Sequence, residues 1–111
     1  MTRTNAAITL LSAALLGAGG DALVRGALHR ESPLPRFLLF LVGACLLFAY
    51  GCVVNAPPWN FGELLGLYIV FFFVVAQLIS WLAFGQAPSR AILLGGVLVV
   101  SGGIVIALNQ K

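Results

Sequence analysis

The sequence predicts an all-α, polytopic membrane protein with four transmembrane helices, and two observations carry this prediction. First, 61% of the 111 residues are hydrophobic and 8% are charged, whereas charged residues make up roughly 25% of an average soluble domain. Second, the chain contains four apolar windows, at about 5–28, 36–56, 63–84 and 91–109, each near the roughly 20 residues that a helix needs to cross a bilayer. The connections are short, so we expect a single domain over residues 1–111.

The apolar windows are interpreted as helices because of how lipid treats the backbone. Lipid offers exposed amides no hydrogen-bonding partner, so a spanning segment is either a helix or a strand of a closed barrel. The windows are continuous apolar runs, without the strict alternation of barrel strands. The first window has the basic start and small residues of a secretory signal, and we interpret it as a first span that is retained.

The charged residues indicate an orientation. The net charge is +3, and the six basic residues are dispersed over connections and ends, so we expect no nucleic acid partner. Four of them would share one side with the first and third connections: Arg25, Arg30, Arg36 and Arg90. Because cytoplasmic loops are enriched in Lys and Arg, we expect these two connections in the cytoplasm.

The chain shows no constellation of residues typical of an enzyme. His29 stands alone in the first connection, so we expect no metal, no cofactor and no covalent chemistry. Cys45 and Cys52 are seven residues apart, which is about 10 Å along a helix and beyond the roughly 7 Å reach of a disulfide. We expect both to be free, buried apolar side chains.

The foremost candidates for substrate or coupling contacts are Asp21 and Arg25, in the segment GAGGDALVRGA. A charge at the bilayer centre costs a few kcal/mol. Arg25 can extend to the interface, whereas Asp21 lies about 6 Å deeper. Two interpretations stay open: a salt bridge within the helix, which the four-residue spacing allows, or an Asp21 that faces a polar cavity.

Three weaker candidates lie in the third window. Asn60 and Glu63 have the spacing of a capping box, and Glu63 is alternatively part of a substrate path. Tyr68 lies deeper than an interfacial aromatic residue, so it either packs or faces a pocket. Gln77 and Ser80 are three residues apart and could share a face, where they would bond to a neighbouring helix or line a cavity.

The fourth window contains two pairs of glycines at seven-residue spacing. Gly95 and Gly102 form one pair, and Gly96 and Gly103 form the other beside it. Helices approach closely along such grooves. We expect this groove to join two copies in a homodimeric bundle; the alternative is packing within one chain.

The order of these segments resembles a known family. GDALVR in the first window, LISWLAFGQAPS at the end of the third and GGVLVVSGGIVIAL in the fourth together resemble the small multidrug resistance family and its EamA-like relatives in the drug/metabolite transporter superfamily. The resemblance covers nearly the whole chain and is strongest over residues 78–108. It implies a dimer in which the last helix, with Gly96 and Gly103, joins the subunits.

One position departs from this family. The resemblance places Gly17 where the family carries the mid-membrane glutamate that binds protons or cations, and Asp21 stands one turn away. Paired four-helix proteins of the superfamily, thought to flip undecaprenyl-phosphate-linked aminoarabinose, also lack this glutamate. They resemble the chain at Asp21 and Arg25, which implies that Arg25 meets a lipid phosphate.

By this resemblance we expect a small transporter of the bacterial inner membrane that moves an amphipathic or lipid-linked substrate, with membrane lipid and either a second copy or a paired four-helix homologue as partners. Two alternatives stay open. One is a multidrug/proton antiporter that uses Asp21 or Glu63 as its proton site. The other is a transport-inactive structural or assembly subunit of a larger membrane complex.

Overall fold

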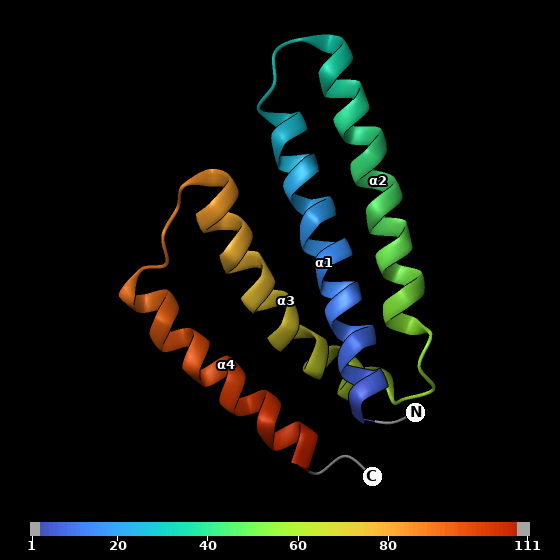
Figure 1. Ribbon diagram of the computed structural model, residues 1–111, viewed down its shortest axis with the longest axis vertical. Helices are drawn as coiled ribbons and strands as arrows, with labels where there is room; N and C mark the ends of the chain where they lie inside the picture. The colour runs from blue at the N-terminus through green and yellow to red at the C-terminus, as the bar shows by residue number, and fades with distance from the viewer. Residues whose placement is uncertain (1–2, 109–111) are drawn as a thin grey trace.

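The computed structural model describes residues 3–108 and contains four helices (Figure 1): α1 Arg3–Leu28, α2 Pro33–Asn55, α3 Phe61–Phe84 and α4 Arg90–Leu108. No strand occurs within this range. All four helices are long and apolar enough to cross a membrane, so the predicted fold class is confirmed. The expected spans agree closely, although the expected end of the last one, at 109, lies outside the described residues.

The largest difference in the helix bounds is the start of α2. The sequence placed it at 36, after two prolines, and the helix begins at Pro33. A proline in the first helical turn loses no hydrogen bond, because the amides of that turn have no partner within the helix. Pro33 and Pro35 therefore open the helix instead of preceding it.

Helices α1 and α2 form a closely packed antiparallel hairpin (Figure 1). Their backbones touch at Gly20 and Gly43, where a Cβ added to either glycine would lie 3.2 Å from the carbonyl oxygen of the other. Small residues allow such an approach in a membrane, where packing rather than water exclusion drives helix association.

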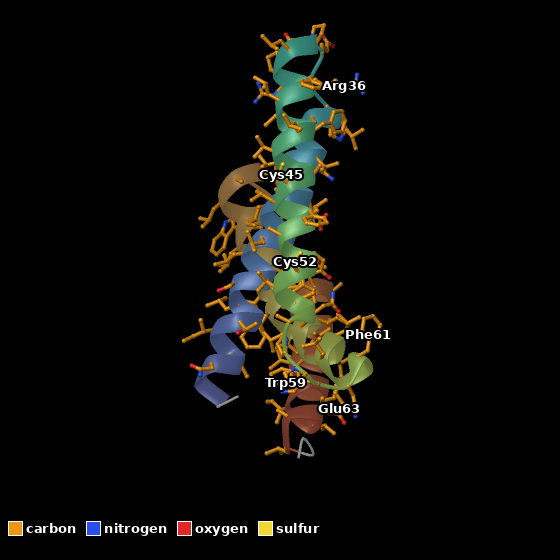
Figure 2. All side chains as sticks on the ribbon, turned by 90° about the vertical axis from the view of Figure 1, so that its right-hand side faces the viewer. Arg36, Cys45, Cys52, Trp59, Phe61 and Glu63 are labelled. Atoms are coloured by element: carbon orange, nitrogen blue, oxygen red, sulfur yellow. The ribbon has the colours of Figure 1, made fainter. Side chains whose placement is uncertain are left out.

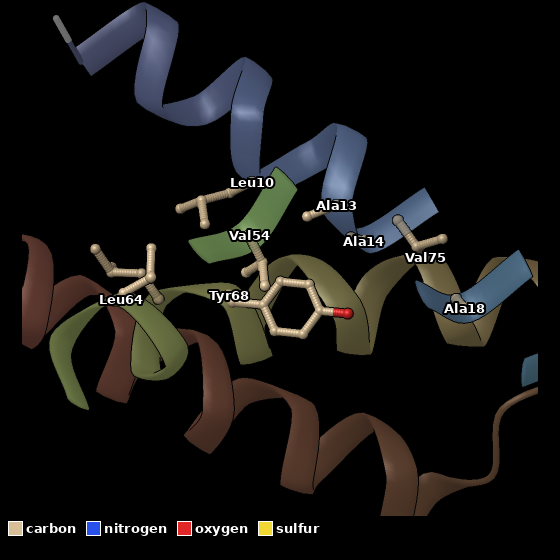
Figure 3. Close-up of a cluster of buried hydrophobic side chains, with 9 residues drawn as sticks. Leu10, Ala13, Ala14, Ala18, Val54, Leu64, Tyr68 and Val75 are labelled. Atoms are coloured by element: carbon tan, nitrogen blue, oxygen red, sulfur yellow. The ribbon is translucent and has the colours of Figure 1, made fainter. Parts of the chain in front are cut away.

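Helix α3 packs against the N-terminal half of α1, and the core lies between them (Figure 3). Ala13, Ala14 and Ala18 of α1 keep the two helices close, and Tyr68 of α3 fills the space beside them. Figure 3 shows the Tyr68 hydroxyl directed along the helices toward Ala18. The core therefore places a phenol oxygen near the middle of α1.

Helix α4 packs along α3. The pair α3–α4 diverges from α1–α2 toward the end that carries the first and third connections (Figure 1). That divergence leaves α1 and α3 apart next to Asp21 and Arg25.

The outer surface is apolar, as expected for helices that face lipid. Phe48, Leu82 and Leu98 are each more than 70% exposed. Cys45 and Cys52 are free and lie along α2 (Figure 2). Both thiols are exposed, so the prediction that they are buried is wrong; α2 turns that face away from α1 and α3.

Candidate functional site: a polar cleft between α1 and α3

The main polar feature is a cavity of about 210 Å³ between the C-terminal halves of α1 and α3. Its polar lining residues are Asp21, Arg25, Ser80 and Gln86; we call it the polar cleft. The remaining lining is apolar and includes Phe72 and Ile79. Polar groups from α1, α3 and the third connection thus meet at one place between apolar helices.

Arg25 contacts the opposite helix instead of its own. Its guanidinium carbon lies 5.6 Å from the centre of the Phe84 ring. No ion pair joins Arg25 to Asp21, so the salt bridge considered from the sequence does not form. The cation–π contact competes with it because the long arginine side chain reaches across the cleft. No hydrogen bond or ion pair to another described residue engages the N–H groups of Arg25, so these donors stay available for a ligand.

The end of α3 sets the position of Gln86. Gly85 adopts a left-handed conformation with φ of 66°, which glycine tolerates without strain. The amide of Gln86 donates to the carbonyl of Ser80 at 2.9 Å. The Ser80 hydroxyl donates to the side-chain Oε1 of Gln86 at 3.2 Å. With Oε1 engaged, the side-chain amide nitrogen of Gln86 remains as a donor group at the cleft.

A second cavity of about 220 Å³ adjoins the first and lies deeper along α1. We call it the aromatic pocket, because three rings line it together with Asp21: Tyr50, Tyr68 and Phe72. The ring centres of Tyr50 and Tyr68 are 5.1 Å apart, and those of Tyr68 and Phe72 are 5.6 Å apart. Asp21 and Phe72 line both cavities, so the two cavities adjoin at these residues.

Gly17 borders the aromatic pocket, and the structure explains its missing side chain. A Cβ at this position would lie 2.5 Å from the Tyr68 hydroxyl and 3.2 Å from Cδ1 of Tyr50. Two tyrosines thus fill the space beside the position at which the resemblance places the glutamate of the small multidrug resistance family. Any carboxylate that works in this region is Asp21, one turn further on.

Glu63 lies far from the cleft. It is exposed in the first turn of α3, near the opposite end of the molecule from Arg36 (Figure 2). Asn60 is the N-cap residue, but its side chain makes no capping hydrogen bond. The predicted capping box is therefore wrong, and the structure does not bring Glu63 to the site.

Gln77 and Ser80 each line a cavity, as one of the two interpretations expected, but they line different ones. Ser80 lines the polar cleft. Gln77 lines a separate, largely apolar groove of about 480 Å³ between α3 and α4, together with Trp81 and Ser101. Tyr68 is buried and lines the aromatic pocket, so it both packs and faces a pocket.

The glycines of α4 divide between two faces. Gly96 and Gly103 are buried against Phe73 and Val70 of α3 in the same chain. A Cβ added at Gly95 or Gly102 would meet nothing within 4 Å. Packing within one chain thus accounts for the first pair, and a contact between two copies through the second pair stays a prediction.

Sequence reasoning missed Tyr50, Phe84 and Gln86. Tyr50 and Phe84 carry no signal beyond an aromatic residue in an apolar window. Gln86 carries one signal in the sequence, because it directly follows Gly85. A glycine that ends a helix turns the chain back toward that helix, so Gln86 is expected to lie near the end of α3. The described residues contain no cluster of three His, Cys, Asp or Glu that could hold a metal ion.

The four apolar helices define the class of this chain as a multi-pass membrane protein. No family model, no curated protein and no solved structure matches it.

Proposed function

We propose that this protein is a small membrane transporter that moves an amphipathic, lipid-linked substrate across the bilayer, with the head group of the substrate in the polar cleft. The observation that carries the proposal is that Asp21 and Arg25 line one cavity without pairing. Charged groups within a membrane span are costly and mark substrate or ion pathways. Two charged side chains that line the same cavity are expected in a protein that binds a polar group between its helices.

The surroundings of the cleft favour an amphipathic substrate. The cleft is bordered by Phe72, Ile79 and Phe84, and the outer faces of the helices are apolar. A head group in the cleft would therefore leave an attached hydrocarbon chain in contact with apolar side chains and lipid, which costs little free energy.

We further propose that the transporting unit is a dimer with a second copy or a paired four-helix homologue. Four helices of this length are few to enclose a pathway, and the face of α4 with Gly95 and Gly102 is open for a close helix contact. Alternating exposure of the cleft would then follow from rocking of one subunit against the other.

A liposome assay tests the transport proposal. The protein is reconstituted with a trace of fluorophore-labelled polyprenyl phosphate, and dithionite, which does not cross the bilayer, bleaches the accessible label. We expect wild-type protein to expose the inner-leaflet label, and Asp21→Asn and Arg25→Gln to slow this exposure about tenfold or more, a barrier increase of roughly 1.4 kcal/mol. Glu63→Gln is the matched control and should behave as wild type.

Three outcomes would replace the proposal. If wild-type protein exposes no more label than protein-free liposomes, lipid transport is rejected. Uptake of a quaternary ammonium dye driven by an acidic interior would establish the antiporter instead. Purification in mild detergent only with a fixed set of unrelated subunits, never as a dimer or a homologous pair, would establish the assembly role.

A further inference from the structure

We propose that the site takes a zwitterionic head group, with its cationic end in the aromatic pocket beside Asp21 and its anionic end at Arg25 and Gln86. This inference rests on the proposed transport function and names the chemistry of the substrate. It follows from three features: a cation-binding end, an anion-binding end, and the position of Asp21 in the lining of both cavities.

The anionic end is built from donors that their neighbours hold in place. Arg25 lies over the Phe84 ring, and no described residue engages its N–H groups in a hydrogen bond or an ion pair. Gln86 is held by Ser80 through its Oε1, which leaves the amide nitrogen as a donor. A guanidinium and an amide N–H group beside each other suit the oxygens of a phosphate or carboxylate.

The cationic end combines a carboxylate with three rings. Asp21 lines the same pocket as Tyr50, Tyr68 and Phe72. An ammonium group is attracted by the faces of aromatic rings, and more strongly where water is excluded. A carboxylate at the same place supplies the formal countercharge.

The charges of the site favour a ligand with two opposite charges over a ligand with one. An ammonium alone would pair Asp21 and leave Arg25 unpaired between the helices; a phosphate alone would do the reverse. Since an unpaired charge in an apolar setting is unfavourable, a ligand with both charges satisfies the site best. The two charged residues are four positions apart, about 6 Å along the helix axis, which leaves room for a short linker between the ligand charges.

The test uses three probes with one hydrocarbon chain and different head groups: dodecylphosphocholine, dodecyltrimethylammonium and dodecyl phosphate. The full chain is purified in uncharged dodecyl maltoside with ¹³C-labelled tyrosine. The chain has two tyrosines, and both line the aromatic pocket, so every labelled resonance reports on the site. We expect dodecylphosphocholine to shift these resonances at a mole fraction about tenfold lower than either other probe.

Two variants separate recognition from a structural effect. Asp21→Asn should abolish the preference for the zwitterion over dodecyl phosphate. Arg25→Gln should abolish the preference over dodecyltrimethylammonium. A merely structural effect would weaken all three probes together. Gln86→Leu, which lies outside the helices and keeps both charges, should weaken the two phosphate-bearing probes and spare the ammonium.

Matched controls remove the same charges elsewhere. Glu63→Gln and Arg36→Gln should keep the wild-type order of the three probes. If wild-type protein binds dodecyltrimethylammonium as tightly as the zwitterion and Arg25→Gln changes nothing, the inference is overturned in favour of a cation site. Equal binding of dodecyl phosphate, unaffected by Asp21→Asn, overturns it in favour of an anion site.

A further experiment uses a head group without a hydrocarbon chain, to find whether the ligand is a lipid or a soluble molecule. If phosphocholine displaces dodecylphosphocholine at a similar concentration, the site binds the zwitterionic head group of a soluble substrate. If it does not displace it, the site binds the head group of a lipid. Binding in micelles requires no transport. A zwitterion preference without lipid transport in liposomes would thus reject only the proposed function, and transport indifferent to head-group charge would reject only this inference.

Discussion

At the scale of single residues, the site depends on which side chains are absent as much as on those present. Gly17 has no Cβ, and the Tyr68 hydroxyl occupies the space that a Cβ would need. The Tyr68 ring in turn lies between the tilted rings of Tyr50 and Phe72 and contacts both, so it has little freedom to move aside. A glycine in α1 thus fixes the wall of the aromatic pocket.

This contact predicts a coupling between Gly17 and Tyr68. Gly17→Ala places a methyl group 2.5 Å from the Tyr68 hydroxyl and should lower the free energy of unfolding by about 1–3 kcal/mol. Tyr68→Phe removes the hydroxyl, so the double variant should recover about 1 kcal/mol or more of that loss. Unfolding in SDS titrated into dodecyl maltoside measures both.

Gly19→Ala is the control for this pair, because a Cβ there meets nothing within 4 Å. It should leave stability unchanged or raise it by up to about 1 kcal/mol, since alanine favours the helix. Strict additivity of Gly17→Ala and Tyr68→Phe would contradict the close contact.

At the scale of elements, α4 presents two different faces. Its inner face, with Gly96 and Gly103, packs on α3. Its outer face, with Gly95 and Gly102, is open. Both glycine pairs have the same seven-residue spacing. The pair on the inner face packs within the chain, and the pair on the outer face is free to contact a partner.

The two faces predict opposite effects of one substitution at adjacent positions. Gly103→Leu would collide with Val70 of α3 and should destabilise the folded chain by about 1–3 kcal/mol. Gly102→Leu should leave unfolding unchanged and reduce self-association, which sedimentation in mild detergent measures. Equal destabilisation by both substitutions would refute the assignment of the two faces.

At the scale of the whole molecule, four antiparallel helices place the first and third connections at one end (Figure 1). Four of the basic residues lie at that end or beside it: Arg25, Arg30, Arg36 and Arg90. The polar cleft opens near the same end, where α3 diverges from α1. In the orientation that the charged residues predict, the cleft lies near the cytoplasmic end of the molecule.

Cysteine labelling tests that orientation. In a background with Cys45→Ala and Cys52→Ala, Glu31→Cys and Ser89→Cys should be protected from an impermeant maleimide in intact cells and react in inverted vesicles. Pro58→Cys, in the second connection, should behave in the opposite way because that connection lies across the membrane. Labelling of Glu31→Cys and Ser89→Cys from opposite sides would contradict the four-span topology itself.

The sequence by itself determined the number of helices, their approximate bounds and their apolar character, because hydropathy and helix length are properties of local segments. It also singled out Asp21, whose cost in an apolar span is visible without a structure. The predictions that failed concerned the surroundings of side chains, as with the expected burial of Cys45 and Cys52, because a position along one helix does not fix the rotation of that helix against its neighbours.

Only the tertiary structure decided what those side chains meet. Asp21 and Arg25 have the spacing of a salt bridge, yet Phe84, nearly sixty residues away in the chain, holds the guanidinium across the cleft. Tyr50 and Gln86 join the site only because α2 and the third connection come back to α1. The composition of a segment determines whether it spans the membrane. A site between helices depends instead on the rotation and separation of those helices, and these are fixed by the packing of residues that are distant in the sequence.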